Sequence, residues 1–576
     1  MARWHIKEQE NFFADKEKEA GAMNVHPVIA RLLRLRGIAF SGQEDFLNPD
    51  YEKSSHDPLL LKGMKEALER IAWAKERGEK VAIFGDYDAD GITSAIIVRE
   101  ALTALGLEVV VYIPDKKKEG YGLNMVAVEE LCRGGAGLII TVDCGITGHK
   151  EVAKARELGT DVIVTDHHHV PEKLIEAFAV INPHRKDCPY PFKELAGVGV
   201  AFKLAQAIYG RFLPEKIGDT KWMLDLVAIG TIADCVPLVG ENRSLTRFGL
   251  LVLSKTRRVG LKEMFTVGKI AVEEGIIPES RAVSFHVAPR INAAGRVDHA
   301  NLAYDLLVSQ DRVHARTLAL ELEAQNAQRQ RMTEAAVNQV RAKVEAQGQN
   351  FLIWAADESF PIGVVGLVAG KIAQQYNRPT MILSRGEKES KGSLRSIETL
   401  NIMKAIEGCA PFLERFGGHA QAAGVTVTNG QLEDFCKALE ERIAAELDGK
   451  DIEIALKLDM ELAAKEIDVL LVRQISDLKP FGQGNEEPLF LIANMRVVQT
   501  RVVGNGTKHL KLTLTPADAS APMLLDSIWF GAGEKADLFG EGEIVDLAAK
   551  LKLDSWNGRE KIQLMVEDMR KASSKE

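Results

Sequence analysis

The sequence predicts an α/β fold: a doubly wound parallel sheet, a long connector helix, a second and smaller α/β domain, and a C-terminal β-barrel. Short apolar runs without polar alternation recur between residues 79 and 170, as expected of central parallel strands that helices cover on both faces. Segments with helical spacing separate these runs, which indicates repeated strand–helix–strand units. Beyond residue 451 the pattern changes to polar–apolar alternation with Gly and Asn turns, which is typical of a small barrel.

Four apolar runs are the predicted strands of the first sheet, and each is followed by a turn that carries an aspartate. The runs cover residues 81–84, 109–113, 138–142 and 162–165, and residues 125–132 and 150–158 are predicted helices between them. In a doubly wound sheet the site lies beyond the carboxyl ends of the strands, so we expect acidic residues to gather there.

The middle of the chain predicts a connector. Residues 296–347 contain neither Gly nor Pro, and residues 311–347 are expected to form one helix of on the order of 50 Å at about 1.5 Å per residue. An ordinary packed helix pair with a short break is the alternative. Residues 351–356 and 379–384 are expected to be strands of a second α/β unit that ends near Gly449.

Short strands with regular turns are expected in the last part of the chain, whereas the first 45 residues have no clear sheet signal. The predicted strands cover residues 489–492, 495–503, 510–514, 527–530, 544–551 and 561–566.

Composition excludes several classes of protein. The 576 residues carry a formal charge of −9, so a nucleic-acid site has to be a local basic groove on an acidic body. No stretch reaches about 18 apolar residues, which excludes a membrane span. The polar N-terminus does not resemble a signal peptide, and the six cysteines have no CxxC spacing. We therefore expect a cytoplasmic protein, and a monomer because no coiled-coil seam is present.

The strongest local signal is a run of three alternating carboxylates, Asp86, Asp88 and Asp90, directly after a predicted strand. These carboxylates would repel one another unless a cation lay among them, and hard divalent cations prefer such oxygens. An EF-hand loop begins in the same way but needs a Glu where this chain has Ile97. Solvated turn acids are the remaining alternative for this motif taken alone.

Further acidic residues follow two other predicted strands. Asp143 follows one, and Asp166 with three histidines at residues 167–169 follows another, while Asp234 lies in an apolar stretch where an unpaired carboxylate is costly. Carboxylate and imidazole ligands without thiolates favour Mn²⁺ or Mg²⁺ over structural zinc. Two such ions can share a carboxylate, activate a water and stabilise both oxygens of a phosphoryl displacement.

The sequence contains no complete example of the other common phosphate-binding and nucleophile motifs. The segment that comes nearest to a P-loop, residues 366–372, is one residue short and lacks the Ser or Thr that would hold Mg²⁺. Nothing resembles a GxSxG elbow or a nucleophilic Cys/His pair.

The motifs DxDxDG, VDCG, DHH and ADC occur in that order, which resembles the DHH phosphoesterase superfamily, and the rest of the chain is similar to its RecJ family of single-strand-DNA-specific exonucleases. The segments that carry the narrower resemblance are residues 119–122, 195–203, 288–296, 363–366, 392–396, 416–424 and 480–485.

The resemblance implies 5′→3′ degradation of single-stranded DNA to 5′-mononucleotides by two-metal-ion hydrolysis, in DNA repair and recombination. Single-strand-binding protein and a helicase are partners implied by the family alone. The implied domains are an N-terminal segment (1–45), a DHH domain (46–295), connector helices (296–347), a DHHA1-type substrate-binding domain (348–450) and an OB-fold single-strand-binding domain (451–576).

Residue roles are implied in the same way. Asp143 is expected to bridge two ions, His168 to lie beside the scissile phosphate, and Asp166 to orient the histidines, while His169 has no matching role. The implied metal ligands are Asp86, Asp88, Asp90, Asp143, His167 and Asp234.

Substrate contacts are expected from donors rather than acids, since Arg suits bidentate phosphate recognition. The implied residues are Lys116, Arg290, Ser393, Arg395 and His419. Lys116–Lys118 stand where the family commonly has Arg, and a solvated basic loop is the alternative there. In the OB segment we expect phosphate contacts and base stacking, unless both tryptophans are core. The OB candidates are Arg501, Lys508, Lys511, Arg559, Lys561, Trp529 and Trp556.

Two alternatives remain open. Another DHH phosphoesterase acting on short oligonucleotides or a cyclic dinucleotide would need neither the long connector nor the barrel. A non-catalytic DNA-binding replication factor of the same ancestry would be expected to lack some of the ligand residues, all of which this chain has.

Overall fold

The computed structural model describes most of the chain, and its contacts divide the chain into two compact units. One unit comprises Met1–Ser54, Pro237–Val239 and Glu453–Glu576, and the other comprises Ser55–Val236 and Gly240–Ile452. Among the described residues, no helix is long and apolar enough to cross a membrane. The described residues are 3–7, 25–116, 118–120, 122–347, 350–450, 452–453, 455–504, 508–518, 523–554 and 560–572.

The larger unit begins with the predicted parallel sheet, whose strand order is β3-β2-β4-β5-β6. Because β3 and β4 lie on opposite sides of β2, the sheet has its topological switch point at the ends of β2 and β4, where ligands bind in doubly wound folds. The strands are β2 (Lys80–Gly85), β3 (Val109–Tyr112), β4 (Ala136–Val142), β5 (Asp161–Thr165) and β6 (Ala179–Ile181).

Helices pack on both sides of this sheet. Val128, Leu131 and Val152 bring two of them against Ala82 and Phe84 on one face, and two others pack against β2 and β4. The first pair is α7 (Met125–Arg133) and α8 (His149–Glu157), and the second is α6 (Ala89–Ala104) and α9 (Gly197–Phe212). An α-helical part follows, which contains α10 (Leu224–Ala233), α11 (Gly240–Leu253), α12 (Val259–Gly268), α14 (Ala288–Val297) and α15 (Asn301–Val308).

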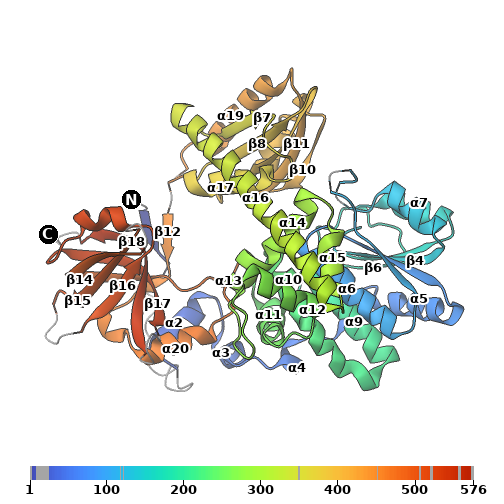
Figure 1. Cartoon of the computed structure of the whole chain (residues 1–576), viewed down its shortest axis with the longest axis horizontal. Helices are drawn as coiled ribbons and strands as arrows, with labels where there is room; N and C mark the ends of the chain where they lie inside the picture. The colour runs from blue at the N-terminus through green and yellow to red at the C-terminus, as the bar shows by residue number, and fades with distance from the viewer. Residues whose placement is uncertain are drawn as a thin grey trace. The chain divides into compact units, whose positions relative to one another are not determined.

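The predicted long helix is confirmed as α16 (Arg312–Gln347), which runs without a break through the larger unit (Figure 1). Near its start, Arg312 Nε lies 2.8 Å from the Glu263 carboxylate of α12. Near its end, Val337 and Val340 join the core beneath α17 (Val365–Tyr376). The helix thus ties the parallel sheet's helical layer to the second α/β part.

The second sheet has the order β10-β11-β9-β8-β7, in which β7 and β8 are parallel and the other pairs are antiparallel. Helix α17 covers one face and α19 (Leu432–Leu447) the other. The strands are β7 (Ile353–Asp357), β8 (Thr380–Arg385), β9 (Glu389–Arg395), β10 (Arg415–His419) and β11 (Ala422–Thr428).

In the smaller unit, strands β14, β15, β16, β18 and β17 pair in that order, and β14 also pairs with β17, so the sheet closes on itself. The strands expected at 489–492 and 495–503 are one strand with a register shift near Ile492. The bounds are β14 (Phe490–Val503), β15 (His509–Pro516), β16 (Leu525–Trp529), β17 (Ile544–Asp554) and β18 (Lys561–Lys571).

The beginning of the chain belongs to this smaller unit. Val28, Ile29 and Leu33 of α2 (Pro27–Leu35) share its core with Leu471 of α20 (Val469–Asp477). Strand β1 (Arg3–Ile6), for which the sequence has no clear signal, pairs with β12 (Ala455–Leu458). The domain boundaries expected from the sequence remain a prediction.

Candidate active site

The structure brings all six predicted metal ligands together at the switch point of the parallel sheet. Three overlapping groups each offer ligand atoms within 4.8 Å of one another. Asp143 and His167 each belong to two of these groups, so they lie at the centre of the cluster. The groups are Asp86, Asp88 and Asp143; Asp90, His167 and Asp234; and Asp143, His167 and His168.

Helix ends fix two of the carboxylates. Asp88 is the N-cap of α6, and its Oδ1 accepts hydrogen bonds from the backbone N–H groups of Asp90 (3.0 Å) and Gly91 (3.1 Å). Asp90 accepts from the backbone N–H groups of Gly197 (2.8 Å) and Val198 (2.9 Å), at the first turn of α9. Helix N-termini favour negative charge, so both carboxylates are held without a side-chain cation.

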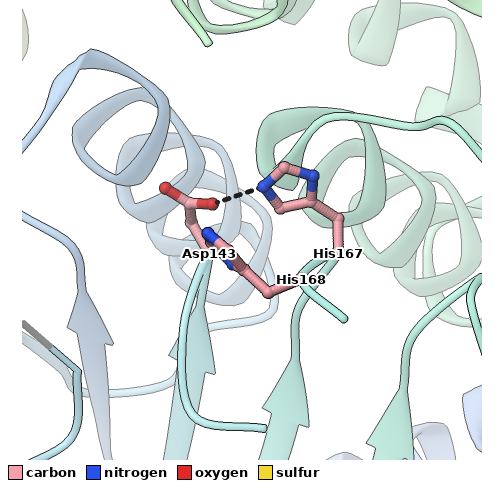
Figure 2. A group of neighbouring side chains, drawn as sticks. All are labelled: Asp143, His167 and His168. Atoms are coloured by element: carbon pink, nitrogen blue, oxygen red, sulfur yellow. Dashed lines mark ion pairs between the residues drawn. The ribbon is translucent and has the colours of Figure 1, made fainter. Parts of the chain in front are cut away.

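Asp143 and His167 face each other at ion-pair distance (Figure 2), and neither Asp143 Oδ1 nor His167 Nε2 has a hydrogen-bond partner among the described residues. His167 Nε2 lies 3.1 Å from Asp143 Oδ1. Burial, and after it the charge of His168, lowers the pKa of His167 to about 3, so the ring is neutral. Since the ring also bonds the Leu195 backbone and Nε2 has no hydrogen-bond partner, that bond uses Nδ1. A nitrogen lone pair therefore points at a carboxylate oxygen, an arrangement that suits a cation shared by both.

Burial also disfavours the charged form of the carboxylates in the cluster. It raises the pKa of Asp86, Asp90 and Asp143 well above the usual value, and neighbouring carboxylates add to the effect. Burial and the charge of Asp88 raise the pKa of Asp234 to about 6. Asp86 Oδ1 is also buried, and it has no hydrogen-bond partner in the part of the chain that the structure describes. Divalent cations would relieve this repulsion, so the donor set fits Mn²⁺ or Mg²⁺.

Asp166 is hydrogen-bonded to both histidines of the cluster. Its Oδ1 accepts hydrogen bonds from His168 Nδ1 (2.7 Å) and from the backbone of His167 (2.7 Å), and its Oδ2 accepts from Ile146 N (2.9 Å). Burial alone would raise the pKa of Asp166, but the His168 ring lowers it overall. The same bond outweighs burial and raises the pKa of His168 to about 9.

Glycine is required where helices approach the carboxylates. A Cβ at Gly230 of α10 would lie 2.7 Å from Asp90 Oδ1, and a Cβ at Gly197 of α9 would overlap the Asp143 carboxylate. Both substitutions would displace a carboxylate of the cluster.

Cations lie beside the acids. The Lys116 ammonium lies 4.5 Å from the centre of the Tyr87 ring. Burial, and after it Arg296, lowers the pKa of Lys116 to about 8, while Asp86 counteracts this and Arg395 adds to it. Lys116 thus lies close enough to both the acidic cluster and two arginines for their charges to act on it. Lys117 is outside the described residues, and Lys118 pairs with Asp115.

Ser393 and Arg395 lie together on β9, against the start of α17. Arg395 Nη1 donates to Ser393 Oγ at 2.7 Å. A Cβ at Gly366 would lie 3.1 Å from Arg395 Nη2 and 3.3 Å from Ser393 Oγ, which places both polar groups at the first turn of the helix. Val364 at the N-cap has no polar group to cap that turn. His419 is in register with Arg395 across the sheet, through Ala422.

Comparisons with known proteins agree with this arrangement. Family models match residues 80–231 (DHH family, N-terminal domain), 348–445 (DHHA1 domain) and 458–568 (RecJ OB domain). The chain is 38% identical to the single-stranded-DNA-specific exonuclease RecJ of Bacillus subtilis (strain 168), over 98% of this chain and 70% of that protein. The chain belongs to the RecJ family.

Other relatives agree with this family. RecJ of Haemophilus influenzae is 34% identical over 94% of this chain and 96% of its own length. The solved structure of RecJ from Thermus thermophilus in complex with Mn²⁺ has a TM-score of 0.83 and 30% identity, and covers 99% of this chain and 80% of that one. A structure of exonuclease RecJ bound to manganese matches 68% of this chain and 98% of its own at 34% identity and a TM-score of 0.59. The predicted family and α/β fold class are confirmed.

Two arginines of the segment 288–296 differ in their surroundings. Arg290, a predicted substrate contact, donates to Glu323 from Nε (2.6 Å) and Nη2 (3.2 Å) and to the His286 carbonyl from Nη1 (2.7 Å). These bonds fasten α14 to α16. Arg296, which was not among the predicted contacts, lies instead close enough to Asp88 for their charges to interact. Arg296 is the last residue of the segment 288–296, which resembles the RecJ family, and this position could have marked it as a candidate from the sequence.

In the segment that matches the RecJ OB domain, Arg501 and Lys511 are cross-strand neighbours on β14 and β15. Trp529 is 7% exposed and packs near Phe539, so it belongs to the core and cannot serve as a stacking surface. Lys508 and Lys561 are exposed, whereas Trp556 and Arg559 lie outside the described residues.

Proposed function

We propose that this chain is a divalent-metal-dependent exonuclease that removes 5′-mononucleotides from the 5′ end of single-stranded DNA. The RecJ family is a family of single-stranded-DNA-specific exonucleases. The observation that carries the proposal for this chain is the acidic cluster, which lies beside a group of cations. Within the described ranges, buried atoms of Asp86, Asp143 and His167 in this cluster have no hydrogen-bond partner.

RecJ from Thermus thermophilus was solved with Mn²⁺ and with Mg²⁺. In this chain Asp86, Asp88 and Asp143 would hold one ion, and Asp90, His167 and Asp234 the other, with Asp143 placed to contact both. When bound, the ions supply charge stabilisation and lower the pKa of a bound water.

The chain's own residues position the reacting groups. We assign His168 to the scissile phosphate, because Asp166 fixes its ring and holds its positive charge, which can stabilise charge that develops on phosphate oxygens. A water attacks the phosphorus and the 3′-oxygen leaves, which yields a 5′-mononucleotide. This chain has every implied metal-ligand residue, which argues against the alternative of a non-catalytic DNA-binding factor.

The 5′→3′ direction of digestion would follow from a pocket that binds the 5′ end of the strand. Ser393, Arg395 and the uncapped first turn of α17 together offer the donors that a terminal 5′-phosphate needs. Lys116 adds a point charge from the side of the acidic cluster. A cavity of about 650 Å³ opens beside Lys116 and Arg296 and gives room for a nucleotide.

The cellular setting follows from the same proposal. The OB domain would bind the undigested 3′ part of the single strand. Repair and recombination would supply such single strands. We infer a cytoplasmic monomer that works with single-strand-binding protein and a helicase.

The direct test is digestion of a single-stranded oligonucleotide, labelled at either end, with Mn²⁺, Mg²⁺ or EDTA, beside the same sequence as a duplex. We expect metal-dependent release of a labelled mononucleotide from the 5′ end of the single strand alone. Binding without cleavage in every metal would contradict the proposal.

A further inference from the structure

Arg329 lies on the long helix α16, away from every motif that the sequence singled out. Its Nε is buried and has no hydrogen-bond partner among the described residues. Its Nη2 donates to Asn326 Oδ1 at 2.9 Å, which is a neutral acceptor one turn earlier on the same helix. The guanidinium therefore lies in a half-buried position with an unused donor.

The charges that act on Arg329 are positive, so they do not offset its own positive charge. Burial, and after it the positive charges of Arg296 and Arg290, lower the pKa of Arg329. Arg290 is neutralised by Glu323, at 2.6 Å. Within the described part of the chain, by contrast, no carboxylate forms an ion pair with Arg329. A half-buried cation beside cations, with an unmet donor, is costly unless an anion completes the site.

The neighbours that these cations share suggest which anion this is. The charges of Arg296 and Arg395 lower the pKa of Lys116, and the charge of Arg296 also lowers the pKa of Arg395. Arg296 itself interacts with the charge of Asp88. Arg329 is instead influenced by Arg296 and Arg290. Arg296 is thus close enough to interact both with the group proposed to bind the strand's 5′ end and with Arg329.

We propose that Arg329, with Arg296 beside it, binds the phosphate that follows the scissile phosphate on its 3′ side. The inference rests on the proposed function, since it presumes a strand whose 5′ end is held by Ser393 and Arg395. The planar guanidinium offers the fork of donors that a phosphate accepts. The connector helix is then part of the DNA site as well as a spacer.

Substrate length tests the proposal. A 5′-phosphorylated dinucleotide contains only the end phosphate and the scissile phosphate, whereas a trinucleotide adds the next one. We expect Arg329→Gln to lower kcat/KM about tenfold on the trinucleotide, mostly through KM, as for loss of one charged phosphate contact, and to leave the dinucleotide unchanged. Arg329→Lys should restore part of the loss.

The matched control is Arg331→Gln, which removes the same charge from an exposed position of α16. Binding of a twelve-nucleotide single strand in EDTA gives a second readout, in which the slope of log K against log salt should decrease by about 0.7 for Arg329→Gln and not for the control. Equal loss on both substrates, or an unchanged salt slope, would overturn the inference. Absence of cleavage by the wild type would instead overturn the proposed function, while the salt slope would still test the phosphate contact.

Discussion

Asp143 occupies the most constrained position of the acidic cluster. Its φ is 59°, in the left-handed region that few residues other than glycine adopt, and its carboxylate is 3% exposed. Such backbone strain persists only where the surroundings hold it, and it is concentrated at functional sites. The turn after β4 thus aims this carboxylate at His167 and at Asp86 together.

Asp143→Ala should abolish metal-dependent hydrolysis, because no other carboxylate is shared between two of the ligand groups. The fold should persist, since the substitution also removes a source of repulsion among buried acids. Cleavage rate in Mn²⁺, DNA affinity and the thermal unfolding midpoint check this, with Asp219→Ala at an exposed position of a 3₁₀ helix as the control. Retained turnover would remove Asp143 from the metal site.

Gly197→Ala should reduce kcat on the order of 100-fold, because its Cβ would push the Asp143 carboxylate out of place and small displacements of reacting groups are costly. Gly210→Ala is the matched control, since it lies on the same helix with nothing within 4 Å of its added Cβ. Equal activity of the two variants would contradict the close approach described for α9.

At the scale of elements, a buried ion pair joins α9 to α11. Lys203 Nζ lies 2.6 Å from Glu241 Oε1, and both side chains are inaccessible to solvent. Lys203 also donates to Ser55 Oγ (2.8 Å), and Glu241 Oε2 accepts from Tyr190 Oη (2.7 Å). Every partner comes from a distant part of the sequence, so the pair fixes how these helices meet.

Lys203→Met should lower the free energy of unfolding by about 3–5 kcal/mol, because Glu241 would be left as an uncompensated buried charge. Adding Glu241→Gln should recover part of this loss, since it removes the charge and keeps the acceptor for Tyr190. Urea denaturation of both variants measures the difference. A double variant no more stable than Lys203→Met would contradict the compensation.

Much of the acidic site could be predicted from the sequence, because Asp86, Asp143 and Asp166 directly follow strands and parallel strands end at one edge. The two arginines of α14 show where this approach fails. Arg290 and Arg296 share one motif, but they point to different neighbours, and Glu323 lies on another helix. Neither periodicity nor motif spacing reports a partner so distant in sequence.

At the scale of the whole molecule, the smaller unit combines both ends of the chain. Strand β1 pairs with β12, and α2 shares a core with α20 and the closed sheet. These contacts join residues that no local pattern connects, which is why the N-terminal strand was missed while the barrel strands were predicted. A deletion after Gly449 would strip the apolar face of α2, so point variants are the better test of the OB domain.

Arg501→Gln with Lys511→Gln should weaken single-stranded DNA binding and reduce its salt slope by about 1.4, at about 0.7 per phosphate contact. The rate on a trinucleotide should stay the same, because all the contacts proposed for so short a strand come from residues of the larger unit, whereas Arg501 and Lys511 belong to the smaller one. Lys465→Gln, at another exposed position of the smaller unit, is the control. A collapse of kcat with unchanged affinity would contradict the role of this surface as a DNA clamp.

The most direct test of the central claim is electron paramagnetic resonance of the protein titrated with Mn²⁺. Two ions about 3.5–4 Å apart that share the Asp143 carboxylate should give the spectrum of an exchange-coupled pair at two equivalents. Asp143→Ala should abolish the coupling. A spectrum of isolated Mn²⁺, or saturation at one equivalent, would contradict a two-ion site in this cluster.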